Sequence, residues 1–272
     1  MIDFSVLMST YRGDDPAQLL EALLSIDCQS VRPTELVLMV DGLVTPEINI
    51  VIENFSNETS LNLIIIRCSE NRGLAQTLRE GVLHCTYDLI ARMDADDISV
   101  VDRFEKQILE FEQQPGLQMV GGSILEFSDL HSETNQRLTP ETYEEIKRTL
   151  LFRSPFNHVT VMFRKEMVLS VGNYKDFRGI EDLGLWFDVV NHTKLIKNIT
   201  DVLVEVRVNP DFINRRSGYK YAKQEFRVYK YAYDEGYISL SEFISVIVFR
   251  TTFRMLPKLF ISRLYKLKRR YE

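Results

Sequence analysis

The first hundred residues alternate short apolar runs with segments of helical periodicity. Four runs have the length and nearly continuous apolar character of strands buried on both faces: residues 4–8, 36–40, 63–66 and 89–93. Helical segments lie among them: one begins near Asp15-Pro16, one spans 74–85, and one runs from about 101 to 114, before Pro115-Gly116. Strands that alternate with helices predict an α/β fold with a doubly wound, mostly parallel, Rossmann-like sheet.

Beyond Gly121 the pattern is less regular. Residues 161–163 have the character of another core strand, and residues 202–208 alternate apolar and polar side chains as a half-solvated strand does. After Pro210 the chain becomes aromatic and basic, and we expect it to be helical to its end. The pattern therefore predicts an α/β domain over residues 1–210 and a helical, basic C-terminal extension over residues 211–272.

Composition and charge narrow the class of protein. Hydrophobic residues make up 45% and charged residues 26% of the chain, which is typical of a soluble globular protein. The net charge is −6, but residues 250–272 carry eight basic side chains against Glu272, a local charge of +7 that leaves −13 on the preceding 249 residues. An acidic body argues against nucleic acid as a partner, whereas the basic end fits an anionic surface.

The cysteines and the N-terminus indicate the compartment. Cys28, Cys68 and Cys85 are odd in number and lack CxxC spacing, which predicts neither a disulfide framework nor a zinc site. The first residues lack the basic and apolar regions of a signal peptide, and no apolar stretch approaches the ~18–20 residues of a membrane-spanning helix. We therefore expect a cytoplasmic protein.

Polar residues follow each of the four predicted strands. They are Ser9-Thr10-Tyr11-Arg12, Asp41-Gly42, Asn71-Arg72-Gly73 and Asp94-Ala95-Asp96-Asp97. Ligands of open parallel sheets bind beyond the carboxyl ends of the strands, so these four ends would offer an aromatic ring, carboxylates and an arginine to one crevice. Any one of them is equally well the polar start of a loop. The four together favour a ligand site.

Asp94, Asp96 and Asp97 place three carboxylates within four residues, where they repel one another. A bound cation would relieve this repulsion, and oxygen-only ligands favour Mg²⁺ or Mn²⁺, which typically bridge carboxylates to substrate phosphates. The alternative is an acidic turn in which Asp97 or Ser99 caps the helix that follows. The cluster alone leaves both interpretations open.

The order and approximate spacing of five motifs resemble those of family-2 glycosyltransferases, which have the GT-A fold. The motifs are residues 5–11, 40–42, 71–75, 93–97 and Glu181-Asp182. The resemblance covers roughly residues 3–208, and residues 103–107 and 172–174 are similar to the bacterial O-antigen and exopolysaccharide branch. It implies a nucleotide-sugar half over about residues 1–115 and an acceptor half over about 116–210.

The resemblance implies a nucleotide site. Tyr11, with Thr10, would pack against the base, and Asp41 would accept a hydrogen bond from it, most naturally from uracil N3–H. Arg72 would lie near the base or the diphosphate. The alternatives are a core tyrosine, a turn aspartate before Gly42 and an arginine that flanks a helix.

The same resemblance assigns the acidic cluster. Asp94, with Ala95, would belong to the nucleotide site, where Asp94 would contact the ribose, and Asp96 would coordinate the Mn²⁺ or Mg²⁺ that bridges the diphosphate. The metal would stabilise the leaving group and would not activate the nucleophile.

Glu181-Asp182 is the candidate catalytic element. In the family a carboxylate at this point removes the proton of the acceptor hydroxyl, which requires it to lie within ~2.6–3.2 Å of that group. Asp182 is the first choice by motif position and Glu181 the second. Both carboxylates would also favour the N-terminus of the helix that follows, and the two interpretations are compatible. A single-displacement, inverting reaction would follow.

Three further features bear on the acceptor. His158 and Arg216 are candidates for contact with the acceptor or the diphosphate, although a structural histidine and a solvated arginine are the simpler interpretations. The C-terminal end is amphipathic and basic, which suits either an interfacial helix on an anionic leaflet or a helix packed on the domain with a basic outer face. Truncation after about residue 240 is expected to release the protein from vesicles and leave the core intact.

These features predict an inverting, metal-dependent glycosyltransferase. The donor would be a nucleotide-diphosphate sugar, with a UDP-sugar favoured, and the acceptor a saccharide or a polyprenyl-diphosphate-linked intermediate of a surface polysaccharide. A sugar-phosphate nucleotidyltransferase is the main alternative, but it would carry a glycine-rich basic loop after the first strand, where residues 9–15 contain one glycine. A non-catalytic nucleotide-binding module is the other alternative, if Asp182 lies away from the crevice.

Overall fold

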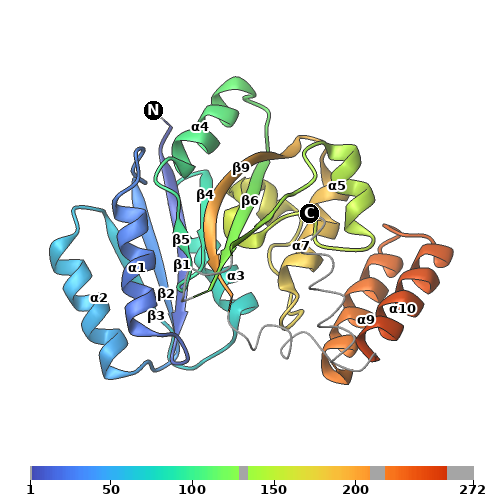
Figure 1. Cartoon of the computed structure of the whole chain (residues 1–272), viewed down its shortest axis with the longest axis horizontal. Coiled ribbons are helices and arrows are strands. Elements are labelled where there is room, and N and C mark those ends of the chain that lie inside the picture. The colour runs from blue at the N-terminus through green and yellow to red at the C-terminus, as the bar shows by residue number, and fades with distance from the viewer. Residues whose placement is uncertain (1, 129–133, 209–217, 256–272) are drawn as a thin grey trace.

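Residues 2–128, 134–208 and 218–255 are described by the computed structural model of the chain. A mixed sheet runs through them, with helices on both faces and a helix pair beyond one end (Figure 1). The strands are β1 (Phe4–Tyr11), β2 (Glu35–Asp41), β3 (Leu63–Arg67), β4 (Leu89–Met93), β5 (Ile98–Ser99), β6 (Met119–Phe127), β7 (Thr134–Arg137), β8 (Met162–Arg164) and β9 (Ile196–Arg207). The helices are α1 (Pro16–Asp27), α2 (Pro46–Glu58), α3 (Leu74–His84), α4 (Arg103–Gln113), α5 (Tyr143–Leu150), the short 3₁₀ helix η1 (His158–Thr160), α6 (Lys165–Ser170), α7 (Glu181–His192), α9 (Tyr219–Asp234) and α10 (Leu240–Met255).

The sheet has two parts that differ in strand direction. β3, β2, β1 and β4 pair in this order and in parallel, as the alternating pattern predicts. Beyond β4, β8 is antiparallel to β4, β6 is antiparallel to β8, and β9 runs parallel to β6. The two remaining strands are also antiparallel to their partners: β5 pairs with β9, and β7 pairs with β6. The α/β class is therefore confirmed, but the sheet is mixed beyond its first four strands.

The core lies on both faces of the parallel strands. Successive side chains of a strand point to opposite faces, so Val6 and Met8 of β1 pack with α1, α2 and α4, whereas Leu7 packs with α3, α5 and α7. This double burial explains why β1 and β2 are almost continuously apolar. Packing on both faces also fixes the position of each strand, so the carboxyl ends of the strands stay beside one another.

The predicted elements are present, and several others were not predicted. The segments 74–85 and 101–114 form α3 and α4, and 202–208 is the end of the longer strand β9. The elements α2, β6 and α5 had no counterpart in the prediction. The alternative in which Asp97 or Ser99 caps the next helix is wrong, because Ser99 lies in β5 and α4 begins after Asp102, whose side chain makes no capping hydrogen bond.

The described part of the C-terminal extension is helical and packs on the domain. Figure 1 shows α9 and α10 side by side beyond α7. Tyr229 of α9 and Val246 of α10 are fully buried in the same core cluster as α7. Truncation after residue 240 would remove Val246, so the expectation that it leaves the core intact is wrong. None of the helices in the described ranges is long and apolar enough to cross a membrane.

Candidate active site

The carboxyl ends of the first four strands lie beside one another, as the sequence predicts. The parallel pairing of β1 and β2 sets Tyr11 opposite Asp41, and β4 lies on the other side of β1 and ends immediately before Asp94. The polar residues that follow these strands are therefore brought to one edge of the sheet. This is the edge at which open α/β sheets bind ligands.

Asp41 organises the turn that starts α3. It is almost fully buried, and its two carboxylate oxygens accept hydrogen bonds from the backbone N–H groups of Arg72 (2.8 Å) and Gly73 (2.9 Å). Gly73 has a φ of 85°, a conformation that a residue with a side chain rarely adopts. The Arg72 side chain lies against Cys68 and forms an ion pair with Glu80. Each oxygen of the Asp41 carboxylate has the capacity to accept a second hydrogen bond.

The loop after β1 presents an aromatic ring to solvent. The side chain of Tyr11 is 46% exposed, and a Cβ atom on Gly13 would lie 2.6 Å from its ring, so only glycine leaves room for this ring position. Asp14 fixes the loop, because its carboxylate accepts hydrogen bonds from the Thr10 hydroxyl (2.9 Å) and the Tyr11 N–H (3.0 Å). Burial, with a smaller contribution from Asp96 and Asp94, raises the pKa of Asp14 to about 6.

The acidic cluster after β4 brings ligand atoms of Asp94, Asp96 and Asp97 within 4.8 Å of one another. Asp96 is exposed, whereas Asp97 is buried and accepts a hydrogen bond from the backbone N–H of Arg207 on β9 (2.9 Å). Burial and the neighbouring carboxylates raise the pKa of Asp97 well above its usual range. Oxygen ligands at this spacing fit Mg²⁺ or Mn²⁺, because a divalent cation offsets this mutual repulsion.

Arg92 lies behind the acidic cluster and was not identified from the sequence. It is 2% exposed, and both terminal nitrogens of its guanidinium contact the carboxylate of Asp94. Its backbone carbonyl accepts a hydrogen bond from Arg103 (2.7 Å), which is also buried and whose pKa burial lowers to about 9. Asp94 lies two residues after Arg92, on the same face of an extended chain, so the sequence carried a signal for this pair that the prediction missed.

Glu181 and Asp182 occupy the first turn of α7 with different surroundings. Glu181 is buried and its carboxylate accepts a hydrogen bond from the Gly179 N–H (2.8 Å); burial and Asp182 raise its pKa to about 7. Asp182 is half-buried, and one of its oxygens lies 3.4 Å from the Ser154 hydroxyl. Asp182 is therefore the more accessible carboxylate of the two.

His158 is engaged within the protein. Its Nε2 lies 2.8 Å from the hydroxyl of the buried Tyr174, and its ring packs edge-on against Trp186. Burial and the nearby charge of Arg92 lower the pKa of His158 well below its usual range. These contacts favour the structural interpretation of this histidine. Arg216, the other candidate for contact with the acceptor or diphosphate, lies outside the described residues.

Electrostatic interactions show that the acidic cluster and the Glu181-Asp182 pair share one region. Burial raises the pKa of Tyr174, and Asp182, Glu181 and Asp94 add to this shift, whereas Arg92 opposes it. The charge of Arg92 also acts on Glu181. The charges of carboxylates almost ninety positions apart in the sequence thus act on the same buried tyrosine.

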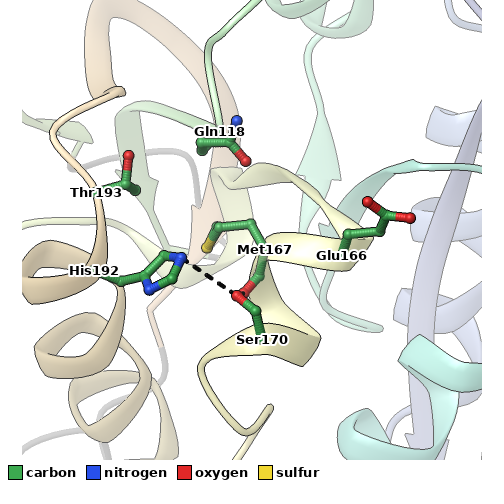
Figure 2. Close-up of a pocket in the computed structure, with 6 residues that line it drawn as sticks. All are labelled: Gln118, Glu166, Met167, Ser170, His192 and Thr193. Atoms are coloured by element: carbon green, nitrogen blue, oxygen red, sulfur yellow. Dashed lines mark hydrogen bonds between the residues drawn. The ribbon is translucent and has the colours of Figure 1, made fainter.

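A cavity of about 390 Å³ lies elsewhere, beside α6 and the end of α7 (Figure 2). It is lined by Gln118, Glu166, Met167, Ser170, His192 and Thr193. His192 and Ser170 are within 3.4 Å of each other, and Figure 2 shows the Glu166 carboxylate turned away from them. Gln118 immediately precedes β6, whereas the candidate site lies beyond the opposite ends of the parallel strands. The cavity offers no grouping of functional side chains comparable to the strand-end site.

Comparisons with known proteins decide the family. A sequence model of glycosyl transferase family 2 matches residues 5–176. The chain belongs to glycosyl transferase family 2. It is 35% identical over 264 residues to the UDP-Gal:alpha-D-GlcNAc-diphosphoundecaprenol beta-1,3-galactosyltransferase of Escherichia coli, covering 97% of this chain and 95% of that protein. It is 33% identical over 267 residues to the amylovoran biosynthesis glycosyltransferase AmsE of Erwinia amylovora, with coverage of 98% and 99%.

Solved structures agree in fold with this glycosyltransferase. S. aureus TarS 1–349 in complex with UDP-GlcNAc matches with a TM-score of 0.66 at 14% identity, over 84% of this chain and 66% of that chain. The Pyrobaculum calidifontis mannosyltransferase PcManGT, in complex with GDP-Man and Mn²⁺, matches with a TM-score of 0.64 at 16% identity, over 95% and 71%. The GT-A fold and the glycosyltransferase class are therefore confirmed, in preference to a nucleotidyltransferase or a non-catalytic module.

Proposed function

We propose that this family-2 glycosyltransferase moves a sugar from a UDP-sugar to a lipid-linked saccharide of bacterial surface-polysaccharide synthesis, with inversion at the anomeric carbon. The observation that carries this proposal is the convergence of the acidic cluster after β4 and the Glu181-Asp182 pair on α7 around Arg92 and Tyr174. This arrangement supplies a cation site for a leaving diphosphate and a carboxylate for the attacking hydroxyl in one crevice.

The donor is assigned to the ends of β1, β2 and β4. The exposed ring of Tyr11 offers a stacking face for a base, with Thr10 holding the loop, and Asp41 has acceptor capacity left for an N–H of uracil. Arg72, whose backbone N–H binds Asp41, is assigned to the base or the diphosphate. Asp94, with Ala95, faces the ribose. A UDP-sugar is favoured because the name of the E. coli relative specifies UDP-Gal and TarS was solved with UDP-GlcNAc.

Asp96 is the residue to which we assign the divalent cation, because it is the exposed member of the acidic cluster. Asp94 is tied to Arg92 and Asp97 to the backbone of Arg207, which leaves them as supports at the same site. Bound Mn²⁺ or Mg²⁺ would offset the negative charge that develops on the leaving diphosphate. PcManGT, which shares the fold, was solved with Mn²⁺.

Asp182 is the base in this proposal. The acceptor oxygen forms a bond to the anomeric carbon while the bond from that carbon to the diphosphate oxygen breaks, and the hydroxyl proton passes to Asp182. UDP leaves with the bonding electron pair. Glu181 is buried and its carboxylate is held by the Gly179 N–H, so it suits the orientation of the loop better than proton removal.

The lipid-linked acceptor places the enzyme at the cytoplasmic face of a membrane. Leu240, Ile244 and Val248 follow one another at four-residue steps on α10 and are each more than half exposed, and Phe249 lies beside them. The sequence that follows, residues 256–272, is rich in lysine and arginine. An apolar helix face followed by basic residues suits an anionic lipid surface. A diphosphate-lipid acceptor, as named for the E. coli relative, would be presented there.

A donor screen tests the proposal. Nucleotide release is measured with UDP-, GDP- and dTDP-sugars, each with Mn²⁺, with Mg²⁺ and with chelator, in the presence of a diphosphate-lipid-linked saccharide. We expect release from a UDP-sugar that needs both the metal and the acceptor, and a product of inverted anomeric configuration. Release that is unaffected by chelator, or that is fastest with GDP- or dTDP-sugars, would contradict it.

A further inference from the structure

The loop that follows α5, residues 151–155, is held by the C-terminal helices. The Tyr229 hydroxyl of α9 donates a hydrogen bond to the carbonyl of Leu151 (3.1 Å), and the Arg250 guanidinium of α10 donates one to the carbonyl of Phe152 (2.6 Å). Carbonyls at the end of a helix lack partners within the helix, and a cation is favourable there. Two consecutive carbonyls of the 151–155 loop therefore depend on α9 and α10.

Arg250 is itself fixed in place. It forms an ion pair with Glu225 of α9, whose side chain is 2% exposed, and its guanidinium lies over the ring of Tyr229, 5.1 Å from the ring centre. The neighbouring Phe249 packs edge-on against Phe152. Removal of one member of a buried ion pair is strongly destabilising, so Arg250 is held to this position. The helix pair meets the 151–155 loop through specific contacts and not through apolar packing alone.

The same loop reaches the proposed base. The Ser154 hydroxyl accepts a hydrogen bond from the Trp186 indole N–H (3.0 Å) and lies 3.4 Å from a carboxylate oxygen of Asp182. Its single proton is shared between Asp182 and the carbonyl of Phe156, which is 2.9 Å away. Only Arg153 separates Phe152, which Arg250 holds, from Ser154, which contacts Asp182.

A second connection runs through α7. Asp188 lies six residues after Asp182 on this helix, and its buried carboxylate accepts a hydrogen bond from the Tyr231 hydroxyl of α9 (2.6 Å) and pairs with Lys175. Phe187 packs edge-on against Tyr229. α9 thus fixes the helix that carries Asp182, while α9 and α10 together fix the loop beside it.

We propose that the α9–α10 pair positions Asp182 for catalysis and that Arg250 is the positioning residue that sets the 151–155 loop. The inference rests on the proposed role of Asp182 as base. Small misplacements of a catalytic group reduce turnover strongly, even when the altered residue is remote from the reacting atoms. Because the donor residues lie at the ends of β1, β2 and β4, loss of Arg250 reduces turnover and acceptor use, and leaves nucleotide affinity unchanged.

The first test compares Arg250→Gln with Arg227→Gln in the full-length chain. Arg227 lies exposed on α9 and hydrogen-bonds Gln224 on its own helix, so its change has the same chemistry without the loop contact. We expect Arg250→Gln to lower kcat by about tenfold or more, with UDP affinity in Mn²⁺ retained. Arg227→Gln should resemble the wild type, and Arg250→Lys should recover part of the loss because it keeps the charge beside Glu225. Wild-type kcat in Arg250→Gln would overturn the proposal.

A second test asks whether Arg250 acts through Ser154. Ser154→Ala and the double variant with Arg250→Gln are measured together, because residues that act through one contact show non-additive effects. We expect Arg250→Gln to cost less in the Ser154→Ala background than in the wild type; additive losses would overturn the proposed route. If Arg250→Gln does not fold, Tyr229→Phe takes its place in the comparisons with Arg227→Gln and with Ser154→Ala. This change removes only the hydroxyl that contacts Leu151.

Asp182→Asn separates the two proposals. If that variant keeps turnover, the proposed base is wrong. A second outcome is that Asp182→Asn loses turnover while Arg250→Gln and Tyr229→Phe fold and have wild-type kcat. In that case Asp182 remains the base, and the proposed positioning role of α9 and α10 is wrong.

Discussion

The donor and acceptor sides of the proposed site are built in different ways. On the donor side, Thr10, Tyr11 and Asp41 end strands of the parallel sheet and the acidic cluster follows one, and strands buried on both faces hold them. On the acceptor side, Asp182 stands at the start of a helix and is supported by the 151–155 loop and by α9 and α10. In the proposed mechanism, binding of the nucleotide thus depends on the sheet, whereas placement of the base depends on segments that are distant in sequence.

The two sides meet at Arg92. Its guanidinium binds Asp94 on the donor side, and its charge opposes the raised pKa values of Glu181 and Tyr174 on the acceptor side. Variants that separate donor binding from turnover therefore test whether the division between the two sides is real.

The largest effect is expected on the donor side. Asp96→Ala should reduce metal-dependent turnover by about 10³-fold or more, because the developing charge of the diphosphate loses its cation. Asp102→Ala is the control, since this nearby acid pairs with the partly exposed Lys106 and should matter little. Initial rates of nucleotide release over a range of Mn²⁺ concentrations provide the measurement. Full activity of Asp96→Ala would refute the assignment of the metal.

The next effect is expected on the acceptor side. Asp182→Asn keeps the size of the side chain and removes its basicity, so turnover should fall by ~10²–10⁴-fold. Single-turnover rates with saturating donor and acceptor measure the chemical step. Glu181→Gln should lose less, because Glu181 is directed to the Gly179 N–H. A larger loss in Glu181→Gln than in Asp182→Asn would exchange the roles of the two residues.

The buried Glu181 should make stability depend on pH. Its pKa is about 7 in the folded protein against a usual 4.5, so the folded state binds this proton more tightly. The stabilisation is complete below pH 4.5 and is lost as the pH rises through 7, by roughly 3 kcal/mol in total. Denaturant unfolding from pH 4.5 to 7.5 should show this loss of unfolding free energy in the wild type and not in Glu181→Gln. Asp14, whose pKa is about 6, titrates in both proteins, so its contribution cancels in the comparison. Parallel curves for the two proteins would contradict the assigned pKa.

The smallest effect concerns the exposed face of α10. Ile244→Asp should weaken binding to phosphatidylglycerol vesicles by about tenfold, the cost of losing one buried apolar side chain. Leu109→Asp, a matched change at an exposed position of α4, should have no effect on vesicle binding. Turnover with a water-soluble acceptor should be unchanged in both. If Ile244→Asp binds vesicles as the wild type does, α10 is not the membrane contact.

The donor side could be predicted from sequence because its signals are local. Each strand is a continuous apolar run, and the functional residues come directly after it, so position along the chain gives position in space. α2 carried a usable signal that the prediction missed: Thr45 before Pro46, followed by Ile48, Ile52 and Phe55 on one face. The role of Asp14 in the β1 loop could also have been predicted, because it is an acidic residue only three positions after Tyr11.

The acceptor side carried weaker signals for a physical reason. β6 contains Gly121 and Gly122, where side chains of Asn198 and Leu203 approach the backbone closely, so the strand lacks the alternation that would reveal it. Ser154, the partner of Asp182, comes from a remote segment, and no local pattern shows that the two will meet. The motif position of Asp182 could be inferred from resemblance, but its support by Ser154 and Arg250 could not.

The most direct measurement compares UDP affinity with and without Mn²⁺ in Asp96→Ala and Asp182→Asn, side by side with the wild type. If the cation and nucleotide belong to the sheet side and the base to α7, Asp96→Ala loses the Mn²⁺-dependent gain in affinity. Asp182→Asn then retains it within about twofold although its turnover is lost. Loss of the gain in both variants, or in Asp182→Asn alone, would contradict the division of the crevice into a donor side and a base side.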